Sequence, residues 1–234
     1  SQCTILFANG THSPQNPKVQ RELLGEQVFK SMNVVNHYAA SDDVVYLGTT
    51  TRETHVSINR LVAESDGVIA VGPVMHHYFA GFGGGPKLLI PGTAHRTTIL
   101  ENHRLTLEKS GIFHPHCAEG NLNGNPVYED IVEAIRWCPS AWYLGLVLGE
   151  DDNILFAESG DIISTHRKLS AKVSASLEIE IHGLADLVIT SAGGYPRDIT
   201  FIQAHKTIHH ACAAVKKGGV VLCLAECSEG IGSS

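Results

Sequence analysis

Short apolar runs alternate along the chain with longer segments in which apolar residues recur at helical spacing. The apolar runs predict buried strands at residues 3–8, 34–37, 44–47, 68–71, 142–148, 187–190 and 220–225. Helical spacing predicts helices at residues 19–32, 56–63, 99–110, 126–137, 162–177 and 200–216. Strands that alternate with helices are typical of parallel sheets, so the pattern predicts an α/β fold.

A polar seam at residues 178–183 interrupts this alternation and indicates a boundary between two domains. We predict an N-terminal α/β domain over residues 1–178 and a second, partial α/β domain over residues 184–234. The second segment is short for an α/β domain, and the chain starts inside a predicted strand. We therefore expect a shortened form of a longer fold, with the first strand missing.

Composition narrows the class of protein. The chain is 43% hydrophobic, which excludes a disordered acidic tail, and its net charge of −7 argues against a nucleic-acid binder that neutralises phosphates. No apolar run reaches the length of a membrane span, and no signal peptide opens the sequence. The six cysteines form no CxxC pair, so we expect reduced thiols in a cytoplasmic protein that acts on neither membranes nor nucleic acids.

A glycine-rich loop after the fourth predicted strand contains the highest density of candidate functional residues. Residues 76–87 read HHYFAGFGGGPK, and glycines followed by Lys87 are typical of loops that hold an anion on backbone N–H groups. Pro86 before the lysine and Leu88 after it exclude a Walker A loop. A flexible glycine turn with a solvated lysine is the alternative that the loop alone leaves open.

Histidine is unusually frequent, with 14 in the chain. His12 follows the first predicted strand, His77 lies ten residues before Lys87, and His103 lies sixteen after it. Strand ends of an open α/β sheet converge on one crevice, so these residues are expected to lie near one another.

These segments resemble the nickel-dependent lactate racemase family. The resemblance runs from about residue 5 to residue 232, and several separated motifs carry it in the family's order. They are Asn9-Gly10-Thr11-His12, HYFAGFGGGPK at 77–87, Ile90-Pro91-Gly92, Asn102-His103, Gly193-Gly194-Tyr195-Pro196 and Gln203-Ala204-His205-Lys206.

The resemblance implies a nickel-pincer cofactor, a pyridinium-3-thioamide-5-thiocarboxylic acid mononucleotide. The family's covalent lysine falls on Lys87 and its nickel-binding histidine on His103. A histidine and two sulfur ligands suit nickel. Gly83, Gly84 and Gly85 would let the backbone approach the nucleotide.

The resemblance also implies the reaction, the racemisation or epimerisation of a lactate-like 2-hydroxy acid in a crevice between two domains. Hydride would pass to the cofactor and return to either face of the 2-oxo acid. The two acid–base histidines fall on His12 and His77, and imidazole has a suitable pKa for this role. The substrate carboxylate would be bound by Gln203 and Lys206. Proteins that make the cofactor are the implied partners, and the sequence says nothing of the oligomer.

Two departures keep other functions open. The family's Asp-x-Thr-Arg-Pro segment is absent from the chain, and Ile202 stands where the family tends to carry tyrosine. The first alternative is therefore a module that holds nickel or the cofactor without turnover. The second is a zinc-dependent hydrolase that uses His77 and its neighbours. Residues 114–117 (HPHC) and 209–212 (HHAC) could also contribute zinc ligands, but neither has a second ligand pair at finger-like spacing.

Overall fold

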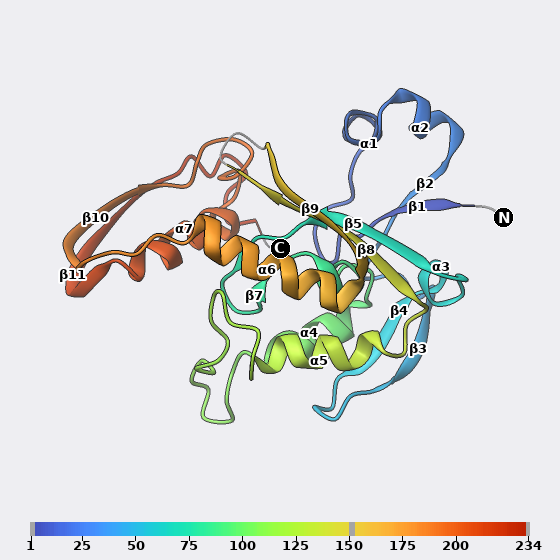
Figure 1. Cartoon of the computed structure of the whole chain (residues 1–234), viewed down its shortest axis with the longest axis horizontal. Coiled ribbons are helices and arrows are strands. Elements are labelled where there is room, and N and C mark those ends of the chain that lie inside the picture. The colour runs from blue at the N-terminus through green and yellow to red at the C-terminus, as the bar shows by residue number, and fades with distance from the viewer. Residues whose placement is uncertain (1–2, 150–152, 233–234) are drawn as a thin grey trace. The chain divides into compact units, whose positions relative to one another are not determined.

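The computed structural model describes residues 3–149 and 153–232. The chain divides into two compact units, Ser1–Ser176 and Leu177–Ser234. Both units combine strands with helices (Figure 1), so the α/β class is confirmed.

The first unit contains parallel and antiparallel strand pairs. β1 pairs in parallel with β2, and β5 pairs in parallel with β8, whereas β3–β4, β6–β7 and β8–β9 are antiparallel. The strands are β1 (Thr4–Phe7), β2 (Asn33–Asn36), β3 (Val44–Thr49), β4 (His55–Asn59), β5 (Val68–Pro73), β6 (His76–His77), β7 (Gly81–Phe82), β8 (Ala141–Leu148) and β9 (Ile154–Asp161). Parallel pairing is thus present, and the three-stranded sheet β5–β8–β9 is mixed because β9 pairs antiparallel to β8.

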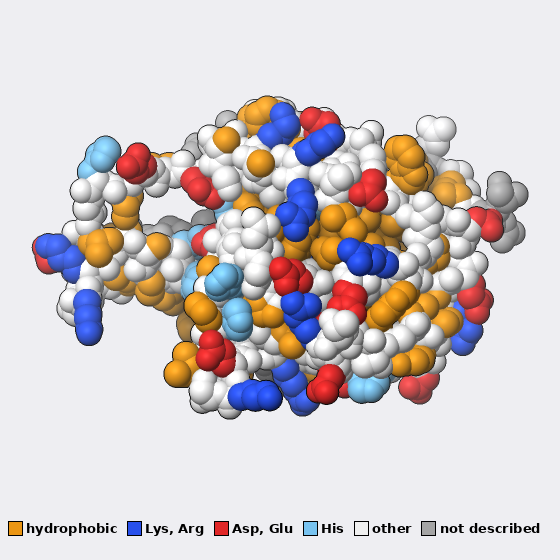
Figure 2. All heavy atoms as spheres, turned by 60° about the horizontal axis from the view of Figure 1, so that its bottom comes forward, with side chains coloured by type: hydrophobic (Ala, Val, Ile, Leu, Met, Phe, Trp, Pro, Cys, Tyr) orange, Lys and Arg blue, Asp and Glu red, His pale blue; other side chains and the backbone are white. Residues whose placement is uncertain are grey.

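The helices of this unit are short, apart from the last. They are α1 (Pro17–Leu24), α2 (Glu26–Ser31), α3 (Arg60–Ala63), the 3-10 turn η1 (Gly85–Leu88), α4 (Arg96–Arg104), α5 (Pro126–Ile135) and α6 (Ile162–Leu177). No helix in residues 3–149 and 153–232 combines the length and the hydropathy that a membrane span requires. Figure 2 shows charged side chains of both signs mixed with hydrophobic patches on one face of the molecule.

The second unit is a strand–helix–strand element. β10 (Ala185–Ser191) and β11 (Val215–Leu224) pair in parallel, and α7 (Phe201–Cys212) connects them. α7 buries Ala204 and Ala211. One face of the two-stranded sheet exposes apolar side chains at registered positions, namely Leu187, Ile189, Val220, Leu222 and Leu224.

Four predicted helices are wrong in their extent, and one of them, predicted at residues 99–110, is α4, which spans Arg96–Arg104. Residues 56–63 form the end of β4 followed by the single-turn α3, because Val56 and Ile58 alternate inward and are fully buried against the core. Residues 19–32 form two helices, because Gly25 adopts φ +75° and ends α1. The last predicted helix ends at Cys212, and residues from Val215 join β11.

The start of α5 ties the core to the glycine-rich segment. Asn125 caps the helix, since its side-chain oxygen accepts the backbone N–H groups of Val127 and Tyr128 at 3.2 Å, and Pro126 occupies the first turn. The Asn125 amide also donates to the backbone oxygen of Phe79 at 2.8 Å. A single side chain therefore fixes both the start of α5 and the position of Phe79.

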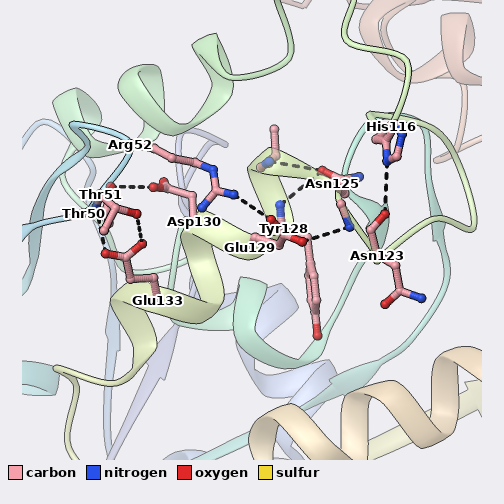
Figure 3. Close-up of polar contacts among 12 residues, drawn as sticks. Thr50, Thr51, Arg52, His116, Asn123, Asn125, Tyr128, Glu129, Asp130 and Glu133 are labelled. Carbon is pink, nitrogen blue, oxygen red and sulfur yellow. Dashed lines mark hydrogen bonds and ion pairs between the residues drawn. The ribbon is translucent and has the colours of Figure 1, made fainter.

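A buried carboxylate links the β3–β4 turn and α4 to α5. Asp130 accepts hydrogen bonds from Thr50 Oγ1 at 2.5 Å, Thr54 Oγ1 at 2.9 Å and Asn102 Nδ2 at 2.8 Å. Figure 3 shows Thr50 beside Asp130 at one end of this network. Asn102 belongs to α4, so the network fixes α4 directly before His103.

Candidate functional site

The segments that carry His12 and Lys87 are joined through Gly92. Gly10 N–H donates to Gly92 O at 2.9 Å, and Gly92 N–H donates to Lys87 O at 2.9 Å. His12 is exposed at the end of the β1 loop, where its N–H donates to Asn9 O at 2.9 Å. The structure therefore places the predicted catalytic loop of His12 against the segment that follows Lys87.

The β6–β7 hairpin fixes the ring of His77. Its Nδ1 accepts the backbone N–H of Ala80 at 3.2 Å, and its ring stacks on Tyr78 with centroids 5.2 Å apart. Because Nδ1 is an acceptor here, the neutral ring carries its proton on Nε2.

Phe79 brings three of the predicted site residues together. Its ring centroid lies 4.5 Å from the His77 ring, 5.0 Å from the His103 ring and 5.4 Å from Lys87 Nζ. Phe79 is buried, and a buried aromatic face attracts an ammonium group. Phe79 was not among the residues predicted from the sequence, although it lies two residues after His77 in the same motif.

His103 is half-buried, and its imidazole is neutral near pH 7. Burial, with a further contribution from the charge of Lys87, lowers the pKa of His103 to about 4. Within the described part of the chain, its Nε2 atom is buried and has no hydrogen-bond partner. A neutral imidazole nitrogen of this kind is suited to bind a metal ion.

The three consecutive glycines of the loop differ in how much space a side chain would have at each position. A Cβ on Gly84, which has φ +76°, would lie 2.3 Å from Pro73 O, and a Cβ on Gly85 would lie 2.5 Å from Cγ of His166. A Cβ on Gly83 would make only ordinary contacts with Met75. Internal packing thus accounts for Gly84 and Gly85, and cofactor binding by the three glycines stays a prediction.

His166 lies beneath this loop. It is fully buried on α6, its Nε2 is 3.1 Å from Gly83 O, and its ring stacks on Tyr128 with centroids 5.7 Å apart. Burial is the largest cause that lowers the pKa of His166 to about 4, and the charges of Lys87 and Arg167 lower it further. The ring is therefore neutral near pH 7, and Nε2–H donates to the carbonyl.

We expect acid to destabilise the fold through His166. The folded-state pKa of about 4 lies below the ordinary value of 6.5, so the unfolded chain binds this proton more readily. The contribution of the neutral ring is complete above pH 6.5 and is lost as the pH falls toward 4, by roughly 3 kcal/mol. Urea unfolding from pH 8 to pH 4 measures it. His166→Gln should show a smaller loss in this window, and an equal loss in both proteins would contradict the assignment.

The second unit brings Gln203 and Lys206 together on the first turns of α7. Lys206 Nζ donates to Gln203 Oε1 at 2.8 Å, which leaves the amide NH₂ group of Gln203 as a donor. Burial lowers the pKa of Lys206. The loop before α7 is held by Asp198, which is buried and accepts the N–H of Glu226 at 3.0 Å. An amide donor beside an ammonium group is suited to bind a carboxylate.

The alternative metal ligands do not assemble into a protein-only site. No group of three or more His, Cys, Asp or Glu side chains that could hold a metal occurs within residues 3–149 and 153–232. The His114 and His116 rings are 5.8 Å apart, whereas the Cys117 thiol is buried and directed to Leu105 O and Asn125 Oδ1. A nickel site supplied mainly by a cofactor needs only one protein ligand, and Nε2 of His103 fits that requirement.

Comparison with known proteins identifies relatives of both units. A family model for the lactate racemase N-terminal domain matches residues 1–113, and one for the lactate racemase C-terminal domain matches residues 181–234. Lactate racemases from Thermoanaerobacterium thermosaccharolyticum and Lactiplantibacillus plantarum are each 33% identical to 97% of this chain, which covers 53% of either. The chain thus spans about half the length of the curated relatives it matches.

Two solved structures share the fold. The lactate racemase apoprotein from Thermoanaerobacterium thermosaccharolyticum matches with a TM-score of 0.90 at 32% identity, over 98% of this chain and 54% of that one. A structural-genomics protein from Thermotoga maritima matches with a TM-score of 0.67 at 18% identity, over 85% of this chain and 53% of that one. The second likeness shows the fold alone. The first shows that the chain matches about half of a longer architecture.

Proposed function

Because the chain belongs to the lactate racemase family, we propose that it acts in the racemisation or epimerisation of a lactate-like 2-hydroxy acid with a nickel-pincer cofactor. The observation that carries the proposal is the grouping of His77, Lys87 and His103 around the ring of Phe79. That grouping combines an amine, a metal-binding imidazole and a group that can transfer a proton.

The residues present fit the cofactor in two respects. His103 offers a buried nitrogen that has no hydrogen-bond partner among the described residues, and its lowered pKa keeps the ring neutral near pH 7, as a metal-binding imidazole must be. Lys87 Nζ and the His103 ring both contact the ring of Phe79, and the charge of Lys87 acts on His103, so a group attached to the amine lies within reach of the imidazole. When bound, the cofactor supplies an acceptor for hydride from C2 of the substrate.

The chain's own residues bind the substrate and transfer protons. His12 and His77 are the proposed pair that removes the hydroxyl proton and returns it, each for one enantiomer. The Gln203 amide and the Lys206 ammonium are the proposed donors to the carboxylate, since their mutual hydrogen bond orients both groups. The buried ring of Phe79 keeps water from one side of Lys87 and His103.

The proposal is tested by loading the protein during expression. The chain is co-expressed with the cofactor-synthesis proteins, and its intact mass, its nickel content and the conversion of single enantiomers of lactate and other 2-hydroxy acids are measured. We expect a covalent adduct in the peptide that contains Lys87 and stoichiometric nickel. We also expect either enantiomer of the acid that the protein accepts to be converted into a mixture of both.

Each alternative has its own result. Adduct and nickel without conversion of any 2-hydroxy acid would overturn the catalytic part of the proposal and identify a binding module. No adduct and no nickel would overturn the cofactor assignment. Expression of the chain alone, without the cofactor-synthesis proteins, is the matched control, and it should give neither adduct nor activity.

A further inference from the structure

His166 contacts the glycine loop on both sides of Gly84. Its Nε2–H donates to Gly83 O at 3.1 Å, and its ring lies so close to Gly85 that a Cβ there would collide with it. Gly85 is the first residue of η1, and Lys87 N–H closes that turn by donating to Gly84 O at 3.1 Å. Contacts made by one side chain of α6 therefore define the start of the turn that carries Lys87.

We propose that His166 is a positioning residue for Lys87. The hydrogen bond to Gly83 and the packing against Gly85 fix the start of η1 and thereby the place of the Lys87 amine beside Phe79. The inference rests on the proposed function only in treating Lys87 as the point of cofactor attachment.

Stability alone does not account for a histidine at this position. Nδ1 of His166 is buried and, across the described residues, has no hydrogen-bond partner. A buried acceptor without a partner costs free energy, and an apolar residue of similar volume would avoid that cost. The side chain also lies near the charges of Lys87 and Arg167 and against the ring of Tyr128.

Only a neutral donor of the right length satisfies these constraints together. A lysine or arginine would place a further charge near Lys87, and a leucine would leave Gly83 O without its donor. Glutamine can place its amide nitrogen close to the position of the histidine Nε2. The required property is thus an uncharged N–H at a fixed distance from Gly83, which gives the proposal a rescue test.

The test measures the reactivity of the Lys87 amine in protein without cofactor. Wild type, His166→Leu and His166→Gln are pulse-acetylated with acetic anhydride from pH 7 to pH 10, and peptide mass spectrometry compares Lys87 with the exposed Lys109. In His166→Leu we expect the ratio of Lys87 acetylation to Lys109 acetylation at pH 8 to rise about three-fold. A rise of this size corresponds to a fall of about half a unit in the Lys87 pKa. His166→Gln should restore the wild-type profile.

A control on the same helix separates positioning from general loss of stability. Val173 is fully buried on α6 and lies two turns after His166. Val173→Ala should lower the melting temperature and leave the Lys87 profile unchanged. An unchanged or lower ratio in His166→Leu would overturn the proposal, as would an equal rise in Val173→Ala or failure of glutamine to restore the profile.

A second measurement observes the His166 ring directly in the wild-type fold. In nitrogen-15 NMR of histidine-labelled protein, the His166 signals are assigned by their loss in His166→Gln, and in wild type this ring should be protonated on Nε2 and should not titrate between pH 8 and pH 6. A His166 ring protonated on Nδ1, or one that titrates near pH 6.5, would overturn the proposal. Both experiments use the protein without cofactor, so their failure is distinguishable from a failure of the proposed function, which appears only in the loading experiment.

Discussion

Lys87→Arg is expected to abolish the covalent adduct completely while the protein stays folded. Arginine keeps the positive charge and can still lie over the Phe79 ring, which is 5.4 Å from Lys87 Nζ. Its guanidinium stays protonated, however, and offers no amine for a thioamide bond. The variant therefore separates the charge of the side chain from its nucleophilicity.

The measurement combines intact mass, nickel analysis and the melting temperature after co-expression with the cofactor-synthesis proteins. We expect no adduct, loss of bound nickel, loss of 2-hydroxy acid conversion, and a melting temperature close to that of protein without cofactor. Lys109→Arg is the control, because Lys109 is exposed and lies outside the site. Full nickel content and activity in Lys87→Arg would refute the attachment site.

Gly84→Ala is expected to cost about 2–5 kcal/mol of stability or to prevent folding. Alanine at φ +76° is strained by about 1–2 kcal/mol, and a Cβ only 2.3 Å from Pro73 O adds about 1–3 kcal/mol of overpacking. Neither the carbonyl of Pro73 nor the nearby Tyr143 hydroxyl can move freely, since Tyr143 donates to Gly72 O at 2.8 Å. The loop would have to shift, and η1 with it.

Gly111→Ala provides a matched control for the backbone strain. Gly111 has a similar φ of +80°, but its Cβ would meet no atom within 4 Å. We expect this variant to lose only about 1–2 kcal/mol. Urea unfolding of both variants measures the difference, which reports the packing of Gly84 alone. Equal losses of unfolding free energy in the two variants would show that the close approach of the Gly84 position to Pro73 does not affect stability.

Periodicity predicted elements well where one face of a segment is buried. Residues 162–177 form α6 with the predicted bounds, because buried positions such as Ile162, Leu169 and Val173 follow helical spacing. The prediction failed at residues 56–63, where Val56 and Ile58 fit a strand as well as a helix and pairing with β3 decided the outcome. β9 was missed because the residues of Ile154–Asp161 show no clear alternation of apolar and polar side chains.

The sequence predicted those members of the candidate site that belong to a recognisable continuous motif. His77 and Lys87 share one continuous motif, so the sequence pointed to both, and the contacts through Phe79 now group them with His103. His166 was missed because it meets Gly83 across 83 positions of sequence. No local pattern distinguishes a buried histidine that supports a loop from one that only fills the core.

If His77 transfers protons as proposed, the hydrogen bond between the Ala80 N–H and Nδ1 of His77 couples that transfer to the main chain. A doubly protonated imidazole has no lone pair on Nδ1, so it cannot accept this N–H, and the tautomer that exposes a lone pair on Nε2 cannot accept it either. Every protonation state in which His77 could exchange a proton at Nε2 therefore releases Ala80. The catalytic cycle would then flex the β6–β7 hairpin at each turnover, and the amide of Ala80 becomes a backbone reporter of the histidine's charge.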